Sequence, residues 1–543
     1  MKFSLPILLL SFLLFSCLEK IPVDSIIYNA NIYTVDSSFK QATFLAIKDG
    51  RFVAIGSKDE VLSSYQSRHK VDAKGKTILP GWIDAHCHFY GLGLMRQRVD
   101  LSGIQSFDDI LQKVVAFQKI HQHDYILGEG WDQNLWEDNH FPNKALLDNL
   151  FPTTPVALRR VDGHALLVNQ AALDLAKINP KTNYSGGKIL QEDGELTGII
   201  IDKPMELIFN SQPKPTREIQ IEALKEAEQI CFANGLTSVT DAGLDKEIIL
   251  LIDSLQKVGA LHIRVNAMVN YSPENFAYYI NRTPIVTDQL QVNSFKIYAD
   301  GSLGSRGACL KKPYSDQDGH YGQLLSNVEE LEHIVNNIAN SPYQLNCHAI
   351  GDSTNKVILE LYQKYLDQKP NRRWRIEHAQ VVAHSDYSLF NENIIPSVQP
   401  THAISDMLWA EERLGSDRMQ HAYAYADLLA RNGIIALGTD FPIEKVDPRQ
   451  TFHAAVNRRN TAQQPTEGFY KEQALTREQA LKGMTIWAAY AGFEEKIKGS
   501  IEVGKLADFI FLDKDIMTIP MDEISKIKIE ATYLSGDPVF NNQ

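Results

Sequence analysis

Residues 79–88 read Leu-Pro-Gly-Trp-Ile-Asp-Ala-His-Cys-His, an apolar stretch that ends in two histidines one residue apart. Alternate side chains of a β-strand share a face, so His86 and His88 point to the same side. In a parallel barrel this strand end lies at the mouth, where barrel enzymes place their active sites. Two imidazoles on one rigid strand offer a bidentate grip on a metal ion. The stretch predicts a barrel strand with metal ligands, and a pair of packing or surface histidines is the structural alternative.

Further strand candidates follow along the chain, and helical stretches separate most of them. One such helix begins after Thr216, a residue type that caps helices. The alternation predicts an α/β fold, and eight strands fit a (β/α)₈ barrel of the TIM type over 77–495. The segment of about 90–234 is too long for one crossover, so we expect a large insertion after barrel strand 1. The strand candidates are 77–85, 236–241, 262–269, 294–299, 344–347, 375–377, 394–399 and 434–438.

Both ends of the chain have the pattern of short β-strands. Apolar and polar residues mix over 25–55 with a turn signal at Lys48-Asp49-Gly50, and similar segments recur over 499–534. We therefore expect one small β-sandwich domain composed of 17–76 and 496–543.

The first residues have the features of a bacterial targeting segment. Lys2 precedes a largely apolar run over 3–15 that is too short to span a bilayer, and Ser16-Cys17 follows. This resembles the lipobox of bacterial lipoproteins. It predicts a signal peptide over 1–16, lipidation of Cys17, and a chain anchored to a membrane of the bacterial cell envelope. An ordinary secretory signal with a chance cysteine is the alternative.

Charge and cysteine usage narrow the classes of partner. The formal net charge of the 543-residue chain is −13, which argues against nucleic acid as a partner because phosphate binding requires a basic face. The cysteines beyond Cys17 form no CxxC pair. Cys87 and Cys347 each adjoin a histidine of interest, and we expect them to be buried packing residues rather than ligands.

Three more polar residues close later strand candidates. His348 follows 345–347, His378 closes 374–378 and Asp440 closes 435–440. Taken singly, a histidine at a strand end is more often structural than a ligand. Because all three follow the His-x-His pair in order on successive strands, a shared metal site is the better interpretation.

Together these motifs resemble the amidohydrolase superfamily over nearly the whole mature chain, and most closely its YtcJ-like (amidohydrolase 3) group, which includes N-substituted formamide deformylases. The resemblance implies that His86, His88 and Asp440 bind one metal ion and that His348 and His378 bind a second. It also implies that Lys296 bridges the two as a carboxylated lysine. We expect a divalent metal, above all zinc, as one or two ions; an unmodified Lys296 paired with Asp300 or gripping a substrate anion is the alternative. The closer likeness rests on segments 128–132, 162–165, 296–306, 348–352, 375–380 and 438–442.

The resemblance implies hydrolysis of a carbon–nitrogen bond in a small amide, N-formyl compound or cyclic amide by metal-activated hydroxide. Asp440 is then the catalytic base that takes the proton and passes it to the departing nitrogen; a structural aspartate before Pro442 is the competing interpretation. Two other functions stay open: an ester or lactone hydrolase on the same metal scaffold, and a non-catalytic lipoprotein that captures a metal or ligand. The presence of Asp440 argues against the binder.

Five residues outside the metal set are candidates for substrate contacts, each with a structural role as an equal alternative. Either a monomer or a homodimer agrees with the sequence. The five residues are Trp131, Asp162, His164, Arg306 and His402.

Overall fold

The computed structural model describes residues 20–184 and 186–542. The predicted signal peptide and Cys17 lie outside these residues. None of the helices in the described part of the chain is long and apolar enough to cross a bilayer.

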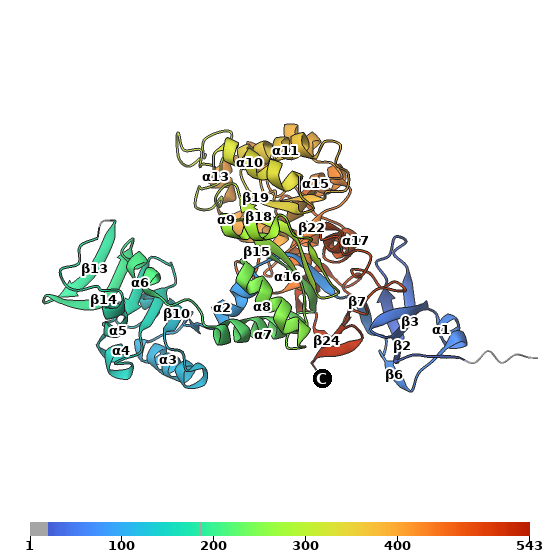
Figure 1. Cartoon of the computed structure of the whole chain (residues 1–543), viewed down its shortest axis with the longest axis horizontal. Helices are drawn as coiled ribbons and strands as arrows, with labels where there is room; N and C mark the ends of the chain where they lie inside the picture. Colours follow the sequence, from blue (N-terminus) through green and yellow to red (C-terminus); the bar gives the residue numbers. More distant parts are fainter. Residues whose placement is uncertain (1–19, 185, 543) are drawn as a thin grey trace, which may run out of the picture.

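A parallel sheet of eight strands, curled into a nearly closed barrel, forms the centre of the molecule and confirms the predicted α/β barrel (Figure 1). Its strands pair in the order β22-β21-β20-β19-β18-β16-β15-β8, and the short β17 (Ile285–Val286) adds an antiparallel partner to β18. The bounds are β8 (Trp82–Cys87), β15 (Leu236–Leu244), β16 (Arg264–Asn270), β18 (Leu290–Tyr298), β19 (Gln344–Ala349), β20 (Trp374–His378), β21 (Ile394–Val398) and β22 (Ala436–Leu437).

The first and last barrel strands meet through the backbone just beyond β22. Asp440 N donates to His86 O at 2.7 Å, and His88 N donates to Phe441 O at 2.7 Å. A Cβ at Gly438 would lie only 2.5 Å from the backbone nitrogen of His86. Only glycine therefore allows the two segments to approach this closely. The seam places Asp440 beside the two histidines of β8.

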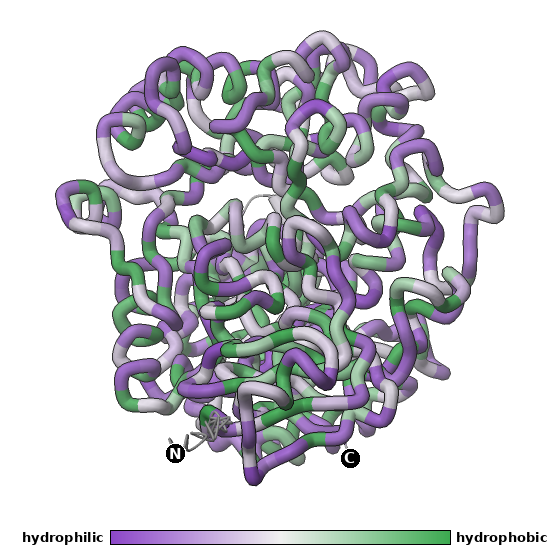
Figure 2. Tube along the Cα trace, turned by 90° about the vertical axis from the view of Figure 1, so that its right-hand side faces the viewer, coloured by the Kyte–Doolittle hydropathy of each residue, from purple (hydrophilic) through white to green (hydrophobic). Residues whose placement is uncertain are grey.

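Helices surround the barrel and bury one large apolar cluster against its strands. In Figure 2 hydrophilic segments are concentrated in the peripheral loops. Thr216 caps α7 as predicted, since its side chain accepts a hydrogen bond from Ile219 N. The helices are α2 (Phe89–Arg96), α7 (Arg217–Ala233), α8 (Lys246–Lys257), α9 (Pro273–Tyr279), α10 (Val328–Ala339), α11 (Asp352–Leu366), α12 (Pro400–Ser405), α13 (Ala410–Leu414), α14 (Ser416–Met419), α15 (Tyr425–Asn432), α16 (Pro448–Asn457), α17 (Arg477–Gly483) and α18 (Ile486–Ala491).

Both chain ends contribute strands to a second sheet, in the order β25-β24-β23-β7-β2-β3-β4 with β6 beside β2. The strand expected over 77–85 divides here: 77–80 pairs with β23 and β2, and the barrel strand starts at Trp82. The division falls at Gly81, whose amide donates to Asp508 O instead of continuing a ladder. The strands are β2 (Ser25–Tyr33), β3 (Gln41–Lys48), β4 (Arg51–Gly56), β6 (His69–Asp72), β7 (Thr77–Pro80), β23 (Phe509–Leu512), β24 (Ile529–Leu534) and β25 (Asp537–Asn541); α1 (Lys58–Ser64) and the pair β1 (Ile21–Pro22) and β5 (Tyr65–Gln66) lie nearby in the chain.

Residues 99–211 form a separate lobe, called the insertion lobe below, which stands apart from the barrel at the left of Figure 1. Its sheet has the order β13-β14-β12-β11-β10-β9. The lobe leaves the barrel after α2 and returns before α7, and Gln97 beside α2 donates to Glu226 on α7. Its elements are β9 (Val99–Asp100), α3 (Phe107–His121), β10 (Ile126–Trp131), α4 (Ala145–Leu150), β11 (Val156–Arg160), β12 (Ala165–Val168), α5 (Gln170–Leu175), β13 (Gly187–Glu192), β14 (Glu195–Asp202) and α6 (Met205–Ser211).

Candidate metal centre

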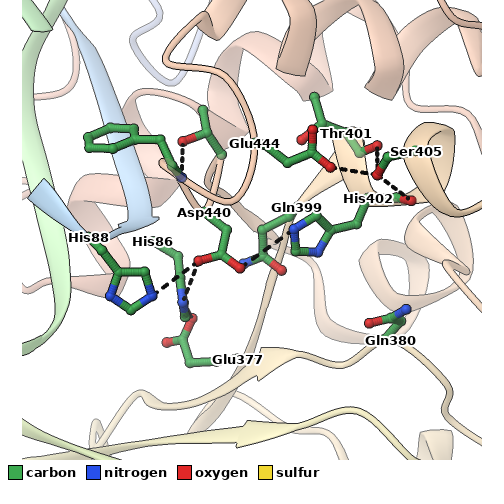
Figure 3. A network of polar contacts seen from close by, with 12 residues as sticks. His86, His88, Glu377, Gln380, Gln399, Thr401, His402, Ser405, Asp440 and Glu444 are labelled. Carbon is green, nitrogen blue, oxygen red and sulfur yellow. Dashed lines mark hydrogen bonds and ion pairs between the residues drawn. The ribbon is translucent and has the colours of Figure 1, made fainter. Parts of the chain in front are cut away.

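Asp440 lies between the histidines at the end of β8 and His402 of α12 at the barrel mouth (Figure 3). Its Oδ1 is 3.3 Å from His88 Nε2 and 3.7 Å from His86 Nε2, and its Oδ2 is 3.5 Å from His402 Nε2. Two groups of three ligands share this carboxylate: His86 and His88 with Asp440, and His378 and His402 with Asp440, each within a 4.8 Å span. Nitrogen and carboxylate oxygen ligands at this spacing suit a divalent metal such as zinc.

His348 and His378, at the ends of β19 and β20, lie on the same side of the barrel. Their ring centroids are 4.6 Å apart, and the His378 ring is 4.9 Å from that of His86. The backbone of His378 has a φ of 72° and that of Asp440 a φ of 63°, both in the left-handed region. Non-glycine residues adopt this conformation at a cost that the surrounding fold has to offset, and such residues gather at functional sites.

Lys296 projects from β18 into the centre. Its Nζ is 3.4 Å from His86 Nε2 and 4.7 Å from the centre of the Tyr298 ring. Burial lowers the pKa of the Lys296 ammonium, although the carboxylates of Glu377 and Asp440 oppose the shift. The environment therefore favours a neutral amine more than water does.

Three histidines of the centre, His86, His348 and His378, are held in their neutral form. Burial, followed by the charge of Lys296, lowers the pKa of His86 to about 4 and that of His348 to about 3. Burial also lowers the pKa of His378 well below its ordinary value. Neutral imidazole is the form that binds metal ions.

Two buried nitrogens indicate that these residues fit a metal ion. Within the described residues, His348 Nε2 and His378 Nδ1 are buried and have no hydrogen-bond partner. A buried polar atom without a partner is costly and calls for an unseen ligand or another explanation. A divalent cation among these nitrogens and Asp440 would satisfy both atoms.

Glu377 is a site residue that the sequence reasoning missed. Its Oε2 accepts a hydrogen bond from His86 Nδ1 at 2.5 Å, and its Oε1 is 2.7 Å from Arg375 Nε. Burial would raise the pKa of this carboxyl, but Arg375 and His86 outweigh it and hold the pKa at about 2. An ionised Glu377 fixes the proton of His86 on Nδ1 and leaves Nε2 free to bind a metal. The only sequence signal for Glu377 was that it directly precedes His378, a candidate metal ligand.

A cavity of about 530 Å³ opens over these residues. His86, His88, Lys296, His348, His378 and Asp440 form its deep part. Among the five substrate candidates, His402 lies on the cavity wall, next to Asp440.

Comparison with known proteins assigns the family. The model of the Amidohydrolase family matches residues 70–540. The chain belongs to this family. The family, the fold and the ligand cluster together identify a metal-dependent hydrolase of the amidohydrolase superfamily.

Two curated proteins and one solved structure illustrate the amidohydrolase likeness. YtcJ of Bacillus subtilis (strain 168), named as a putative amidohydrolase, is 30% identical over 94% of this chain and 98% of its own. The N-substituted formamide deformylase of Arthrobacter pascens is 24% identical over 94% of this chain and 97% of its own. An uncharacterized metal-dependent hydrolase from Pyrococcus horikoshii OT3 superposes with a TM-score of 0.77 at 29% identity, covering 92% of this chain and 99% of that one.

The other four residues expected to contact substrate do not line the cavity of this amidohydrolase. Trp131 is 1% exposed in the core of the insertion lobe, where its indole nitrogen donates to Leu158 O. Asp162 pairs with Arg160 on the same lobe. The other two are His164, which is exposed and paired with Asp202, and Arg306, which is paired with Asp316.

Because Glu377 contacts His86, we expect the Glu377→Gln variant to bind metal more weakly than the parental protein. The glutamine amide can still contact His86 but has no charge to hold the imidazole proton on Nδ1, and Arg375 loses its buried partner. Loss of such an orienting carboxylate lowers metal affinity by about 10- to 100-fold. Competition with a fluorescent chelator measures the affinity, and Glu274→Gln, at a side chain 76% exposed, is the control. Equal affinities for the two variants would contradict the orienting role.

Proposed function

We propose that this amidohydrolase hydrolyses the carbon–nitrogen bond of a small amide, N-formyl compound or cyclic amide. The observation that carries the proposal is the position of Asp440, whose carboxylate faces His86, His88 and His402 at the base of an open cavity. A carboxylate placed beside a metal site in this way serves as a proton acceptor for water. The likeness to an N-substituted formamide deformylase supports the same class of bond.

We assign His86, His88 and Asp440 to one metal ion and His348 and His378 to a second, with Lys296 between them as a carboxylated lysine. Lys296 Nζ lies next to His86 Nε2, which agrees with this assignment. A bound divalent cation supplies Lewis acidity toward the scissile carbonyl and acidifies water. Glu377 orients His86 through its Nδ1, on the ring edge away from Nε2, and Arg375 holds Glu377 by an ion pair.

Asp440 moves the proton. Burial opposes its ionisation, but the hydrogen bond from His88 and the neighbouring imidazoles hold its pKa well below the ordinary value. The carboxylate is therefore ionised at neutral pH and accepts the proton of the attacking water through one oxygen. The same group then delivers that proton to the nitrogen that leaves. His402, 3.5 Å from Oδ2, holds the carboxylate in place.

The proposal is tested by metal analysis together with a screen of paired amides and esters. We expect up to two equivalents of zinc or a similar ion, hydrolysis of an amide, and loss of activity on chelation that is restored by metal. Removing a ligand in His86→Ala is expected to abolish turnover, and Lys296→Ala is expected to lower the metal content. Hydrolysis of the esters with none of the matched amides would contradict the bond class. A protein purified without chelator and free of transition metal would contradict the metal site.

The lipid anchor at Cys17 and the envelope location stay predictions from the sequence.

A further inference from the structure

The outer wall of the cavity carries two carboxylates that form no ion pair with a lysine or arginine within the described part of the chain. Asp406 and Glu444 both line the cavity, on the side of His402. Asp406 Oδ2 accepts hydrogen bonds from Gln380 at 3.1 Å and from Tyr423 at 2.8 Å, and Glu444 Oε1 accepts one from Ser405 at 2.5 Å. Among the described residues, neither carboxylate has a lysine or arginine within ion-pair distance.

Two other carboxylates of the barrel region, one exposed and one buried, do have cationic partners. Asp316 forms ion pairs with both Arg306 and Arg413, and Asp386 forms one with Lys311. Of the described residues, the only lysine or arginine that lines the cavity is Lys296, which lies in the deep part among the metal-site residues. The outer wall therefore presents uncompensated negative charge to any molecule that reaches the metal centre.

Burial raises the pKa of Asp406; His402 and the hydrogen bond from Tyr423 oppose the rise, and the charge of Glu444 adds to it. Asp406 and Glu444 thus face one cavity, and neither has a lysine or arginine partner among the described residues. A cation bound at this wall gains charge-assisted hydrogen bonds, which are about twice as strong as neutral ones.

The rest of the outer cavity is apolar. Trp409 and Leu303 line it, and Ile443, 74% exposed, stands at its rim. At the inner end of the cavity lies His378, which is 6% exposed and whose Nδ1, assigned above to the metal centre, has no hydrogen-bond partner within the described residues. A ligand that fills this space has a polar end at the metal centre, an apolar middle and a second polar end at the carboxylates.

We propose that the substrate is an amide whose alkyl chain ends in a cation, an ammonium or guanidinium group, which Asp406 and Glu444 bind while the amide lies at the metal centre. This inference rests on the proposed function and names its substrate class. The same wall repels substrates that end in a carboxylate. Asp406 and Glu444 are therefore specificity residues, separate from the groups that move the proton.

A matched set of three formamides tests the charge preference directly. The three have the same four-carbon chain and end in guanidinium, in its neutral isostere urea, or in carboxylate. We expect kcat/KM to fall by about tenfold or more from guanidinium to urea, the size of one charged hydrogen bond, and further for carboxylate. Equal values for guanidinium and urea, or a preference for carboxylate, overturn the proposal.

Two variants test whether Asp406 and Glu444 cause the preference for a cationic substrate. In Asp406→Asn and in Glu444→Gln the guanidinium-to-urea ratio of kcat/KM is expected to fall several-fold, whereas Glu274→Gln on α9 keeps the parental ratio. General damage to the fold lowers kcat/KM for both substrates by the same factor and leaves their ratio unchanged. If Asp406→Asn does not fold because the amide serves Gln380 and Tyr423 less well than the carboxylate does, Glu444→Gln decides. A parental ratio in the folded variants overturns the assignment.

A binding experiment separates this inference from the proposed function. Butylguanidinium and its neutral isostere butylurea are titrated calorimetrically into metal-loaded protein, with no turnover required. Tighter binding of butylguanidinium, weakened in Glu444→Gln, supports the cation site even if no amide is hydrolysed. Equal affinity for the two compounds overturns the cation site. This conclusion does not depend on whether the protein hydrolyses amides.

Discussion

The Asp440→Asn protein is expected to retain most of its metal and to lose about 10²- to 10⁴-fold in kcat, the range for a general base. Asparagine keeps the shape of the side chain and one oxygen toward His86 and His88. Its amide cannot accept the proton of water, and one of its ends carries hydrogens where the carboxylate faces His402 at 3.5 Å. Metal analysis and steady-state kinetics on the same preparation measure the two effects separately.

Asp440 has a backbone φ of 63°, a conformation that asparagine adopts as readily as aspartate. The substitution therefore tests the chemistry of the carboxylate rather than the local fold. A variant with full metal content and nearly parental turnover would exclude Asp440 as the base. Joint loss of metal and turnover would show that Asp440 acts first as a ligand.

The largest effect on stability is expected at Asp508, where removal of the carboxylate in Asp508→Ala should lower the free energy of unfolding by about 3–5 kcal/mol. Asp508 binds Arg264 of β16 through both oxygens, at 2.6 and 2.8 Å, and the two side chains are only 5% and 3% exposed. Asp508 Oδ1 also accepts a hydrogen bond from Ser535 N. The change leaves a guanidinium buried without its counterion, between the barrel and the sheet formed by the chain ends.

A second ion pair nearby supplies the control. Arg51 and Asp288 form a bridge of 2.7 Å with side chains 36% and 52% exposed. Asp288→Ala is expected to cost about 1 kcal/mol or less, because water screens an exposed pair. Denaturant unfolding of the two variants gives the comparison. A loss at Asp508 no larger than at Asp288 would contradict the importance of the buried pair.

Much of the barrel, and the gathering of the candidate ligands at its mouth, was predictable because each is encoded locally. The His86-Cys87-His88 segment combines an apolar strand with ligands at a spacing of two, and His348, His378 and Asp440 each close a strand of their own. The seam between β8 and β22 was not predictable in this way. Pairing between strands at opposite ends of the barrel sequence depends on tertiary geometry, which local patterns do not contain.

Two features of the structure differ from what the sequence patterns indicate, and each difference has its own physical cause. Trp131 belongs to a conspicuous motif, yet its indole fills the core of the insertion lobe, and aromatic side chains serve cores as well as pockets. Glu377 escaped notice for the opposite reason, since strand alternation places it on the face opposite to His378. The left-handed backbone at His378 turns that side chain back to the site, so both residues contact His86. Backbone exceptions of this kind are invisible to periodicity.

The seam has a consequence for biosynthesis. His86 and His88 leave the ribosome early, but Asp440 reaches them only when the last barrel strand has been made and its amide bonds to His86 O. Since chains emerge from the amino end and domains fold as units, a nascent or truncated chain presents isolated imidazoles and never the shared carboxylate. In the proposed assignment the ligand set is therefore complete only after the chain has been made through Asp440.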